Sequence, residues 1–215
     1  ERLSPRVLVA HWPGLDRRCN LTAIAGRKGL AIVDTEASPR LLAPIKKRIE
    51  QAFQRRDWAY VINTHAHDNH CGGNALFQGA VIVGHTNLPA DMEWQIKRQR
   101  EPEWRRREID RFRSILDGLQ ANLPQASANP QAARLIRSDL AFYDLFVKDL
   151  EAGYALVPPT LMFGDRKTLD LGDLTLELVF FGRGHSQSDI LVHVPQERVL
   201  VSGGVAYQRG QLPEI

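Results

Sequence analysis

The sequence predicts an α/β fold in which two β-rich parts flank a long helical segment. In the first 85 residues, short apolar runs rich in β-branched side chains alternate with a clear helical pattern. Residues 87–155 then show helical spacing that is broken only near prolines. From residue 156 the β-type runs return, separated by Gly-Asp turns. This order of elements is typical of sheets and helices packed in layers.

Three strands are expected near the N-terminus, at residues 6–10, 21–25 and 30–33. The segment Gly26-Arg-Lys-Gly29 lies between the last two and has the glycines of a hairpin turn. These two strands should therefore pair with each other.

The helix that follows has a clear start, with Ser38 as its N-cap and Pro39 at its first position. It should end near residues 55–56. Its apolar face comprises Leu41, Leu42, Ile45, Ile49 and Phe53. The next apolar run, residues 58–62, has the length and composition of a buried strand, so the helix should pack on a sheet.

Further strands are expected on both sides of the helical segment, at residues 80–84, 160–163, 168–171, 174–181 and 190–194. A short helical turn is expected at residues 75–77. His85 follows the strand at 80–84 without a second ligand type close by in the sequence. Such a histidine usually packs, so we interpret His85 as structural.

The helical segment is expected to be an insertion, residues 87–155, within one domain that spans residues 1–215. Its three helices should cover residues 87–101, 103–119 and 130–152. A segment of this length in a compact domain is often functional, although it can also simply pack on the scaffold.

Composition excludes several classes of protein. No apolar stretch approaches the 18–20 residues that a membrane span needs. The 28 basic and 25 acidic residues nearly balance, so no nucleic-acid partner is expected. Two cysteines, Cys19 and Cys71, do not make a disulfide framework. Because the chain begins at Glu1, we lean towards an exported or periplasmic protein that has lost a signal peptide, with the cytoplasm as the alternative.

A cluster of histidines follows the strand at 58–62. His65, His67 and His70 lie within six positions, just before Cys71-Gly72-Gly73. Neutral imidazole is the commonest protein ligand for zinc and also suits copper, iron and nickel. Three histidines this close together are hard to explain as separate structural residues. The cluster therefore predicts a metal site.

This cluster resembles the hallmark of the metallo-β-lactamase superfamily, which is His-X-His-X-Asp-His followed by Gly-Gly. Asn69 stands where the family has its Asp, and Asp68 lies one place earlier. The segment from Gly182 to His185 resembles the loop that carries the family's third histidine. Asp34, after a strand-like run, resembles its structural aspartate.

The resemblance extends from about residue 20 to residue 207. Residues 199–204 resemble a strand that normally ends in Gly-Asp, but here Gly204 takes the place of the Asp. A later metal-binding histidine of the family would lie beyond Ile215. The resemblance implies a metallo-β-lactamase-like αβ/βα sandwich with a helical insertion.

By this resemblance, His65, His67 and His185 hold one zinc ion and leave one coordination position open, as in catalytic zinc sites. A second zinc would rely on His70, because Asn69 is neutral and Gly204 has no side chain. We therefore expect one zinc ion rather than two.

Two functions are compatible with a centre that has one complete zinc site and lacks most of the second. The first hypothesis is a hydrolase of an ester, thioester, lactone or amide that uses zinc-bound hydroxide on a small-molecule substrate. Asn69 would orient the water, and Asp68 or His70 would move protons. On an extended backbone Asp68 would point away from the metal unless a bulge turned it. The alternative is a catalytically degenerate member that serves as a metal-binding or ligand-binding scaffold.

The insertion at 87–155 offers a candidate lid over the metal cleft. Trp94 and Trp104 would supply apolar surface, and Arg105–Arg107 would attract an anionic substrate. In the alternative, the arginines face solvent and the tryptophans pack the helices together.

Overall fold

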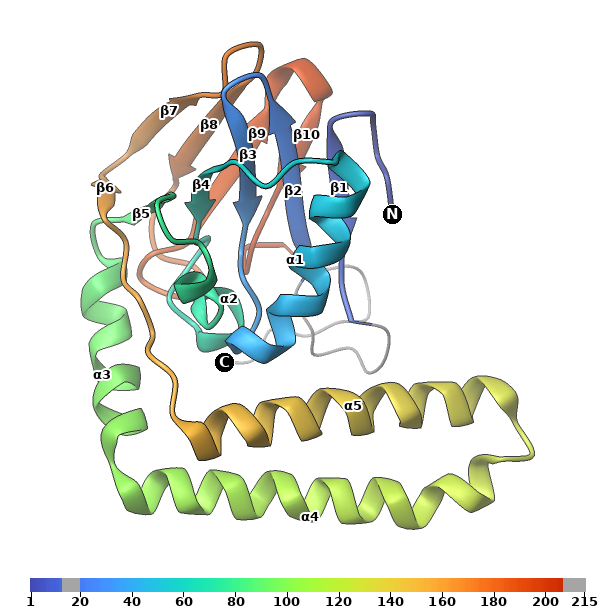
Figure 1. Ribbon diagram of the computed structural model, residues 1–215. Helices are drawn as coiled ribbons and strands as arrows, with labels where there is room; N and C mark the ends of the chain where they lie inside the picture. The colour runs from blue at the N-terminus through green and yellow to red at the C-terminus, as the bar shows by residue number, and fades with distance from the viewer. Residues whose placement is uncertain (13–19, 207–215) are drawn as a thin grey trace.

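The computed structural model describes residues 1–12 and 20–206 of the chain and contains two β-sheets packed face to face (Figure 1). The larger sheet has six strands in the order β1 (Val7–Ala10), β2 (Leu21–Gly26), β3 (Gly29–Val33), β4 (Trp58–Ile62), β5 (Val81–His85) and β6 (Leu161–Phe163). The first three strands are antiparallel, whereas β3 to β6 run parallel. Because β3 and β4 are parallel neighbours, the loops that follow them emerge at the same edge of the sheet.

The smaller sheet is antiparallel throughout, in the order β10 (Val199–Val201), β9 (Ile190–Val194), β8 (Thr175–Phe180) and β7 (Arg166–Asp170). A short 3₁₀ turn, η2 (Pro195–Glu197), joins β9 to β10. Alternate residues of β9 point inward, namely Ile190, Val192 and Val194, as the period of two requires. They meet inward residues of the larger sheet such as Val33 and Ile62 in one apolar core. The strands predicted from the sequence are confirmed to within two residues.

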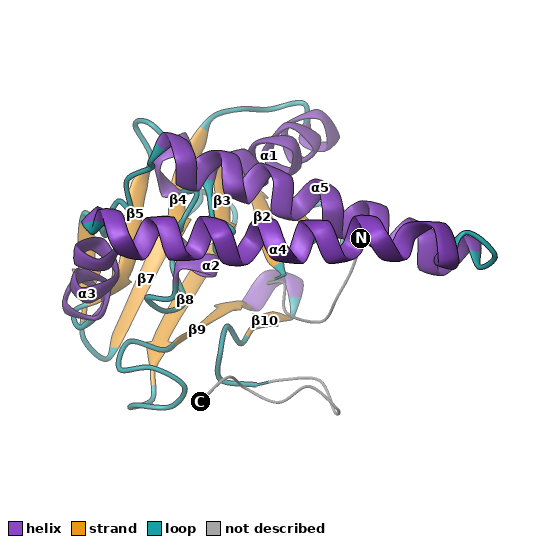
Figure 2. Ribbon diagram, turned by 90° about the horizontal axis from the view of Figure 1, so that it is seen from below, coloured by secondary structure: helices purple, strands orange, loops and turns teal. Residues whose placement is uncertain are grey.

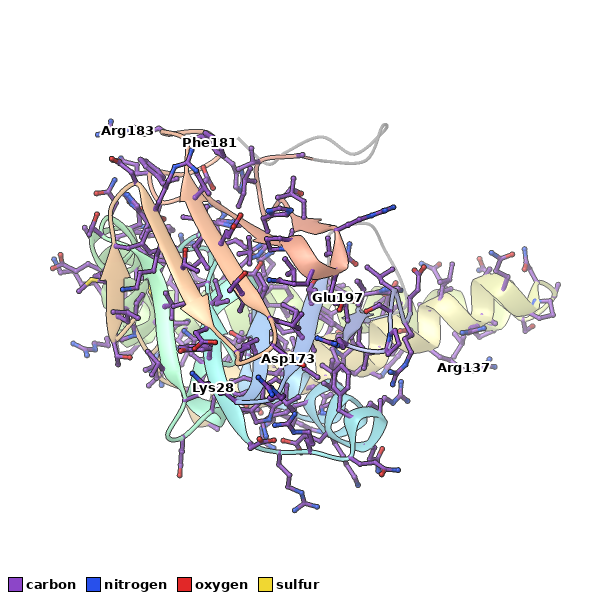
Figure 3. The ribbon with its side chains drawn as sticks, turned by 90° about the horizontal axis from the view of Figure 1, so that it is seen from above. Lys28, Arg137, Asp173, Phe181, Arg183 and Glu197 are labelled. Carbon is purple, nitrogen blue, oxygen red and sulfur yellow. The ribbon has the colours of Figure 1, made fainter. Side chains whose placement is uncertain are left out.

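Two turns join the sheets at one end of the sandwich. The Arg27 N–H donates to Asp173 Oδ1 at 2.7 Å, and the Lys28 N–H donates to the Leu171 carbonyl at 2.9 Å. Lys28 and Asp173 accordingly lie near each other in Figure 3, while Phe181 lies at the far end of β8. That far end leads into the loop that carries His185.

Helix α1 (Pro39–Phe53) covers the outer face of the larger sheet. Its buried residues Leu42, Ile45 and Ile49 pack on outward-facing strand residues that include Leu21 and Val61. The predicted cap is confirmed in position, since Ser38 is the N-cap and Pro39 is the first helical residue. The cap is formed by the extended backbone of Ser38 alone, because its hydroxyl makes no capping hydrogen bond.

Three helices connect β5 to β6: α3 (Leu88–Arg100), α4 (Pro102–Ala126) and α5 (Pro130–Ala152). The prediction that the middle helix ends at Leu119 was wrong, because α4 continues through Pro124 to Ala126. Pro124 lacks a backbone N–H and so removes one helical hydrogen bond. Because it stands in the final turn, the rest of the helix is not disturbed. The start of α5 was predicted correctly: Asn129 Oδ1 accepts hydrogen bonds from the Gln131 and Ala132 N–H groups.

The α4–α5 hairpin lies below the sheets and extends beyond them at its tip (Figures 1 and 2). It docks on the start of α1, where Leu41 packs against Phe146 and Leu150. The Arg40 N–H and Nε donate to the two carboxylate oxygens of Asp149 at 2.7 and 2.9 Å. Among the helices described, none is both long and apolar enough to cross a bilayer.

Candidate metal centre

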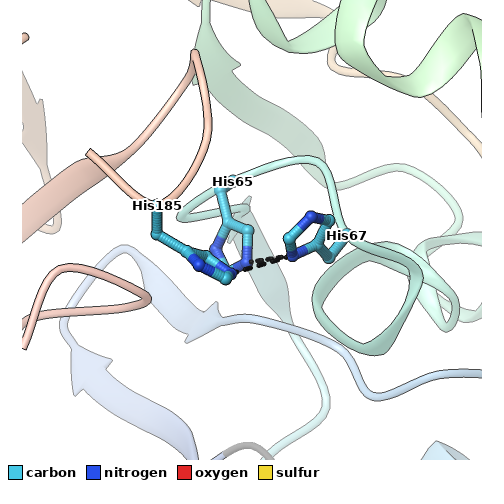
Figure 4. A group of neighbouring side chains, drawn as sticks. All are labelled: His65, His67 and His185. Atoms are coloured by element: carbon cyan, nitrogen blue, oxygen red, sulfur yellow. Dashed lines mark hydrogen bonds between the residues drawn. The ribbon is translucent and has the colours of Figure 1, made fainter. Parts of the chain in front are cut away.

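Three histidines from distant parts of the chain meet at the edge where β3 and β4 end (Figure 4). His65 and His67 follow β4, and His185 lies in the loop between β8 and β9. His67 Nδ1 is 3.1 Å from His65 Nε2 and 3.0 Å from His185 Nε2. Their potential ligand atoms all lie within 4.8 Å of one another. The structure thus brings together the three residues that the sequence proposed as the first metal site.

Two of the three spacings between these nitrogen atoms are close to those of a tetrahedral metal ion. Zinc–nitrogen bonds of roughly 2.0–2.1 Å place tetrahedral ligands about 3.3 Å apart. The distances to His67 Nδ1 are close to this value. Three imidazoles would also leave one of the four tetrahedral positions open.

The side chains behind His65 set its tautomer. Thr64 Oγ1 lies 2.8 Å from Asp34 Oδ2, and a carboxylate only accepts, so the hydroxyl donates to it. The Thr64 oxygen is 3.1 Å from His65 Nδ1 and must therefore accept from that nitrogen. This assignment from the hydrogen-bond network leaves the lone pair on His65 Nε2, the atom that faces His67. Sequence reasoning missed Thr64, whose only signal is its place before the first histidine.

Asp34 is the hub of this network. It is 1% exposed and has a φ of 64°, and its Oδ1 also accepts from the Thr64 N–H at 2.8 Å. Its Oδ2 accepts from His70 Nδ1 at 2.8 Å. One buried carboxylate therefore orients both the first histidine, through Thr64, and the last histidine of the motif.

His70 lies beside the three-histidine cluster but is not one of its members. Its ring centroid is 3.9 Å from that of His65. The bond to Asp34 places a proton on Nδ1, because a carboxylate only accepts. Its role as a ligand of a second metal therefore stays a prediction.

Burial favours the neutral form of His65. The ring is completely buried, and burial holds its pKa far below the usual range, with the neighbouring His70, His67 and His185 adding to the effect. A neutral imidazole is the form that binds metal. Because the fold already keeps His65 neutral, the ring need not lose a proton when a metal ion binds.

The backbone after His67 differs from the expectation. Residues Asp68–Cys71 form a helical turn, α2, with His67 as its N-cap, and a 3₁₀ turn, η1 (Asn74–Leu76), follows. The argument that Asp68 and Asn69 alternate along an extended strand was therefore wrong, because successive side chains of a helix are about 100° apart. Asp68 Oδ1 accepts from the Asn69 N–H at 2.8 Å, and burial raises the pKa of Asp68. The catalytic roles of Asp68, Asn69 and His70 remain predictions.

Gly204 lies directly against the cluster. A Cβ at this position would lie 2.6 Å from His185 Cδ2 and 3.2 Å from His65 Cε1. The segment after β10 therefore reaches the histidine cluster, and a side chain at this position would meet these rings. A side chain there would require His185 to move.

Two neighbouring side chains have structural roles. Cys71 is buried, and its thiol donates to the His65 carbonyl at 3.1 Å. His85 stacks on Phe180 with ring centroids 3.8 Å apart, and its Nδ1 accepts from the Asn87 N–H at 3.2 Å. The structural interpretation of His85 is confirmed.

The tryptophans of the insertion lie beside an arginine of α3. The Arg98 guanidinium lies over the rings of Trp94 and Trp104, at 5.3 and 4.8 Å from their centroids. These residues line a groove of about 620 Å³ between α3 and α4. Arg105 donates to the Gln99 carbonyl at 3.0 Å. Trp94 is 52% exposed at this groove, so the lid over the histidine cluster stays a prediction.

Helix α3 itself does reach the metal site. Gln95 Nε2 donates to the carbonyl of Ala66, the residue between the first two histidines, at 2.7 Å. Ser188 Oγ, in the His185 loop, donates to Asp91 Oδ2 at 2.8 Å. Sequence reasoning found neither Gln95 nor Asp91, because a single polar residue on a helix carries no signal of what it will contact.

Solved structures with the same fold come from enzymes of more than one kind. A metallo-beta-lactamase from Pontibacter korlensis is 15% identical, with a TM-score of 0.58 over 98% of this chain and 73% of that chain. The metallo-beta-lactamase IND-7 is 13% identical, with a TM-score of 0.61 over 98% and 72%. The inverting sec-alkylsulfatase Pisa1 from Pseudomonas sp. is 13% identical, with a TM-score of 0.56 over 90% and 29%. At such identities, the likeness shows the fold alone.

The sequence itself supplies the family. No curated protein matches it significantly. The family model of the metallo-beta-lactamase superfamily, however, matches residues 14–214, which is nearly the whole chain. Together with the two-sheet architecture and the histidine cluster, this match means that the chain belongs to the metallo-beta-lactamase superfamily.

Proposed function

We propose that this protein is a zinc-dependent hydrolase of a small-molecule ester, thioester, lactone or amide. The observation that carries the proposal is the convergence of three histidines, with His65 Nε2 and His185 Nε2 at 3.1 and 3.0 Å from His67 Nδ1 and all potential ligand atoms within 4.8 Å of one another. Superfamily membership supports it, because members bind metal ions and act on small molecules.

His65, His67 and His185 would hold the zinc ion, which would supply a bound water acidic enough to act as a nucleophile near neutral pH. The protein contributes three imidazoles whose positions are set by neighbouring groups. His65 is held neutral by burial and oriented by Thr64, so its Nε2 lone pair is available to a metal. The open fourth position is where substrate and water would meet.

Proton handling would fall to groups beside the cluster. Neutral His70 offers a bare Nε2, because its Nδ1 carries the proton that bonds to Asp34. It is therefore the better candidate for a proton acceptor than Asn69, whose amide can orient water but cannot take a proton near neutral pH. Since losing a general base typically costs ~10²–10⁴-fold in rate, we expect activity only on substrates with good leaving groups.

A single ion fits these residues better than two. The second site would need carboxylates at positions 69 and 204, but Asn69 is neutral and Gly204 has no room for a side chain while His185 keeps its place. His70 alone offers one neutral ligand, which is too few for a tightly held second divalent ion.

The test is metal analysis combined with a hydrolysis panel. We expect one zinc per chain after dialysis, and a cobalt-substituted protein with the visible absorption of tetrahedral coordination. His185→Ala should abolish both and also abolish hydrolysis of an activated ester, thioester and lactam. The matched control is His193→Ala, because His193 is a partly exposed β9 residue that pairs with Glu177 at 3.0 Å.

The second candidate is a metal-binding scaffold without turnover. It is favoured by the absence of the two acidic ligands at Asn69 and Gly204. Zinc binding that depends on His185, with hydrolysis no faster than in the His185→Ala variant, would support this alternative. A protein that takes up no metal in its folded state would contradict both.

A further inference from the structure

Helix α3 contacts both of the loops that carry the histidines. On one side, Gln95 donates its side-chain amide to the Ala66 carbonyl at 2.7 Å, and Gln95 is only 7% exposed. Ala66 stands between His65 and His67, so this bond holds the first loop at its centre. Buried polar groups that pair in this way are costly to separate.

On the other side, α3 holds the loop of His185. Ser188 is completely buried, and its hydroxyl donates to Asp91 Oδ2 at 2.8 Å. One turn earlier, Asn87 Nδ2 donates to the Gln187 carbonyl at 2.8 Å. Asp91 and Gln95 are four residues apart, so they lie on the same face of the helix.

The loop of His185 is a compact unit. Asp189 accepts from the Ser186 N–H at 2.6 Å and from its hydroxyl at 2.9 Å. The Ser188 N–H donates to Ser186 Oγ at 3.1 Å. Because residues 186–189 are tied to each other, an anchor at Ser188 sets the place of the whole loop, including His185.

The helix is itself firmly seated. Leu88 and Met92 are completely buried and pack with Ala66, Cys71 and Leu156 in a separate apolar cluster. The helix therefore cannot shift without opening this cluster, which makes it a rigid link between the two loops.

We propose that α3 is a brace that sets the distance between the two histidine loops, with Asp91 and Gln95 as positioning residues for the metal. The inference rests on the proposed metal site. Neither side chain is among the three that would bind the ion. Their effect is to keep His185 close to the other two histidines before the ion binds. This raises the affinity for zinc, because the loop loses less conformational entropy on binding.

The experiment is a double-mutant cycle on the Asp91–Ser188 bond. Zinc dissociation constants would be measured by competition with a chelator, for Asp91→Ala, Ser188→Ala and the double variant. We expect each single variant to weaken zinc binding by ~10- to 100-fold, and the double variant to be no weaker than either. Asp91→Asn should restore most of the affinity, because its carbonyl can still accept from the Ser188 hydroxyl.

The matched control is Glu93→Ala, which removes an acidic residue of the same helix that pairs with Lys97 at 2.8 Å. It should change the dissociation constant less than twofold. Single-variant affinities within twofold of the parent, or fully additive losses, would overturn the brace while leaving the proposed metal site intact.

A second readout does not need metal. In the metal-free protein, hydrogen exchange of the Ser186 and Ser188 amides should be at least ~10-fold faster in Asp91→Ala than in Glu93→Ala, because the loop loses its anchor. Equal exchange in the two variants would overturn the brace. If the parent protein binds no zinc, the proposed function fails, and this exchange measurement still decides whether α3 holds the loop.

Discussion

The two halves of the proposed metal centre differ in how many of the family's metal-binding residues this sequence contains. The first half has three histidines that could hold a metal ion and the groups behind them, from Thr64 to Asp34. The second half keeps only His70, while positions 69 and 204 lack the carboxylates that the family uses. The difference teaches that the three-histidine cluster does not depend on carboxylates at positions 69 and 204 for its support, because Asp34 orients His65 through Thr64.

The largest expected effect comes from the group that both halves share. Asp34→Asn keeps the shape and tolerates the positive φ, but it removes the charge that accepts from Thr64 and His70. Hydrogen bonds to charged groups contribute about 1.5–3 kcal/mol, so we expect the free energy of unfolding to fall by at least that amount. Zinc affinity should fall as well, since the His65 tautomer is no longer fixed.

Urea unfolding and chelator competition measure the two effects. The control is Asp144→Asn on α5, where an exposed carboxylate pairs with Lys148 at 2.7 Å. A change below about 0.5 kcal/mol is expected there. If Asp34→Asn behaves like this control, the two halves are not held by a common network.

A smaller effect is expected at Gly204, where the position of the missing second-half carboxylate lies against the histidines of the first half. Gly204→Ala introduces a Cβ that would lie 2.6 Å from His185 Cδ2, so His185 must give way and zinc affinity should fall ~10-fold or more. Gly164→Ala is the control, because no atom lies within 4 Å of its added Cβ. Unchanged affinity in Gly204→Ala would show that the segment can move aside and that a carboxylate at this position remains possible.

The smallest effect concerns Cys71, which is buried behind the histidine cluster and bonds to the His65 carbonyl. Burial raises the pKa of the Cys71 thiol well above its usual range, and Asp34 and Asp68 add to this. The thiol therefore stays protonated at pH 8, so iodoacetamide should leave Cys71 unmodified in the folded protein and alkylate it after unfolding. Peptide mass spectrometry reads this residue separately from Cys19, which lies outside the described residues. Rapid labelling of the folded protein would mean that the region around Cys71 opens to solvent.

Several features of this protein follow from the sequence alone. The strands, the cap of α1 and the start of α5 are local, because they depend on side-chain period and on Pro and Asn at helix starts. The cluster of His65 and His67 is also local, since two histidines two residues apart need only a turn to converge. The resemblance then pointed to His185, and the structure brings it to the other two.

Tertiary structure alone decided the rest. The turn α2 replaced the expected extended backbone after His67, and the chain then packs so closely on residues 35–38 that a Cβ at Gly72 or Gly73 would clash. Thr64, Asp91 and Gln95 acquired their roles from partners 30, 97 and 29 residues away. Such contacts leave no periodic or compositional trace, because a hydrogen bond between distant segments depends on where the sheets and α3 place them. The ligands could therefore be read from the chain, whereas the groups that hold them in position could not.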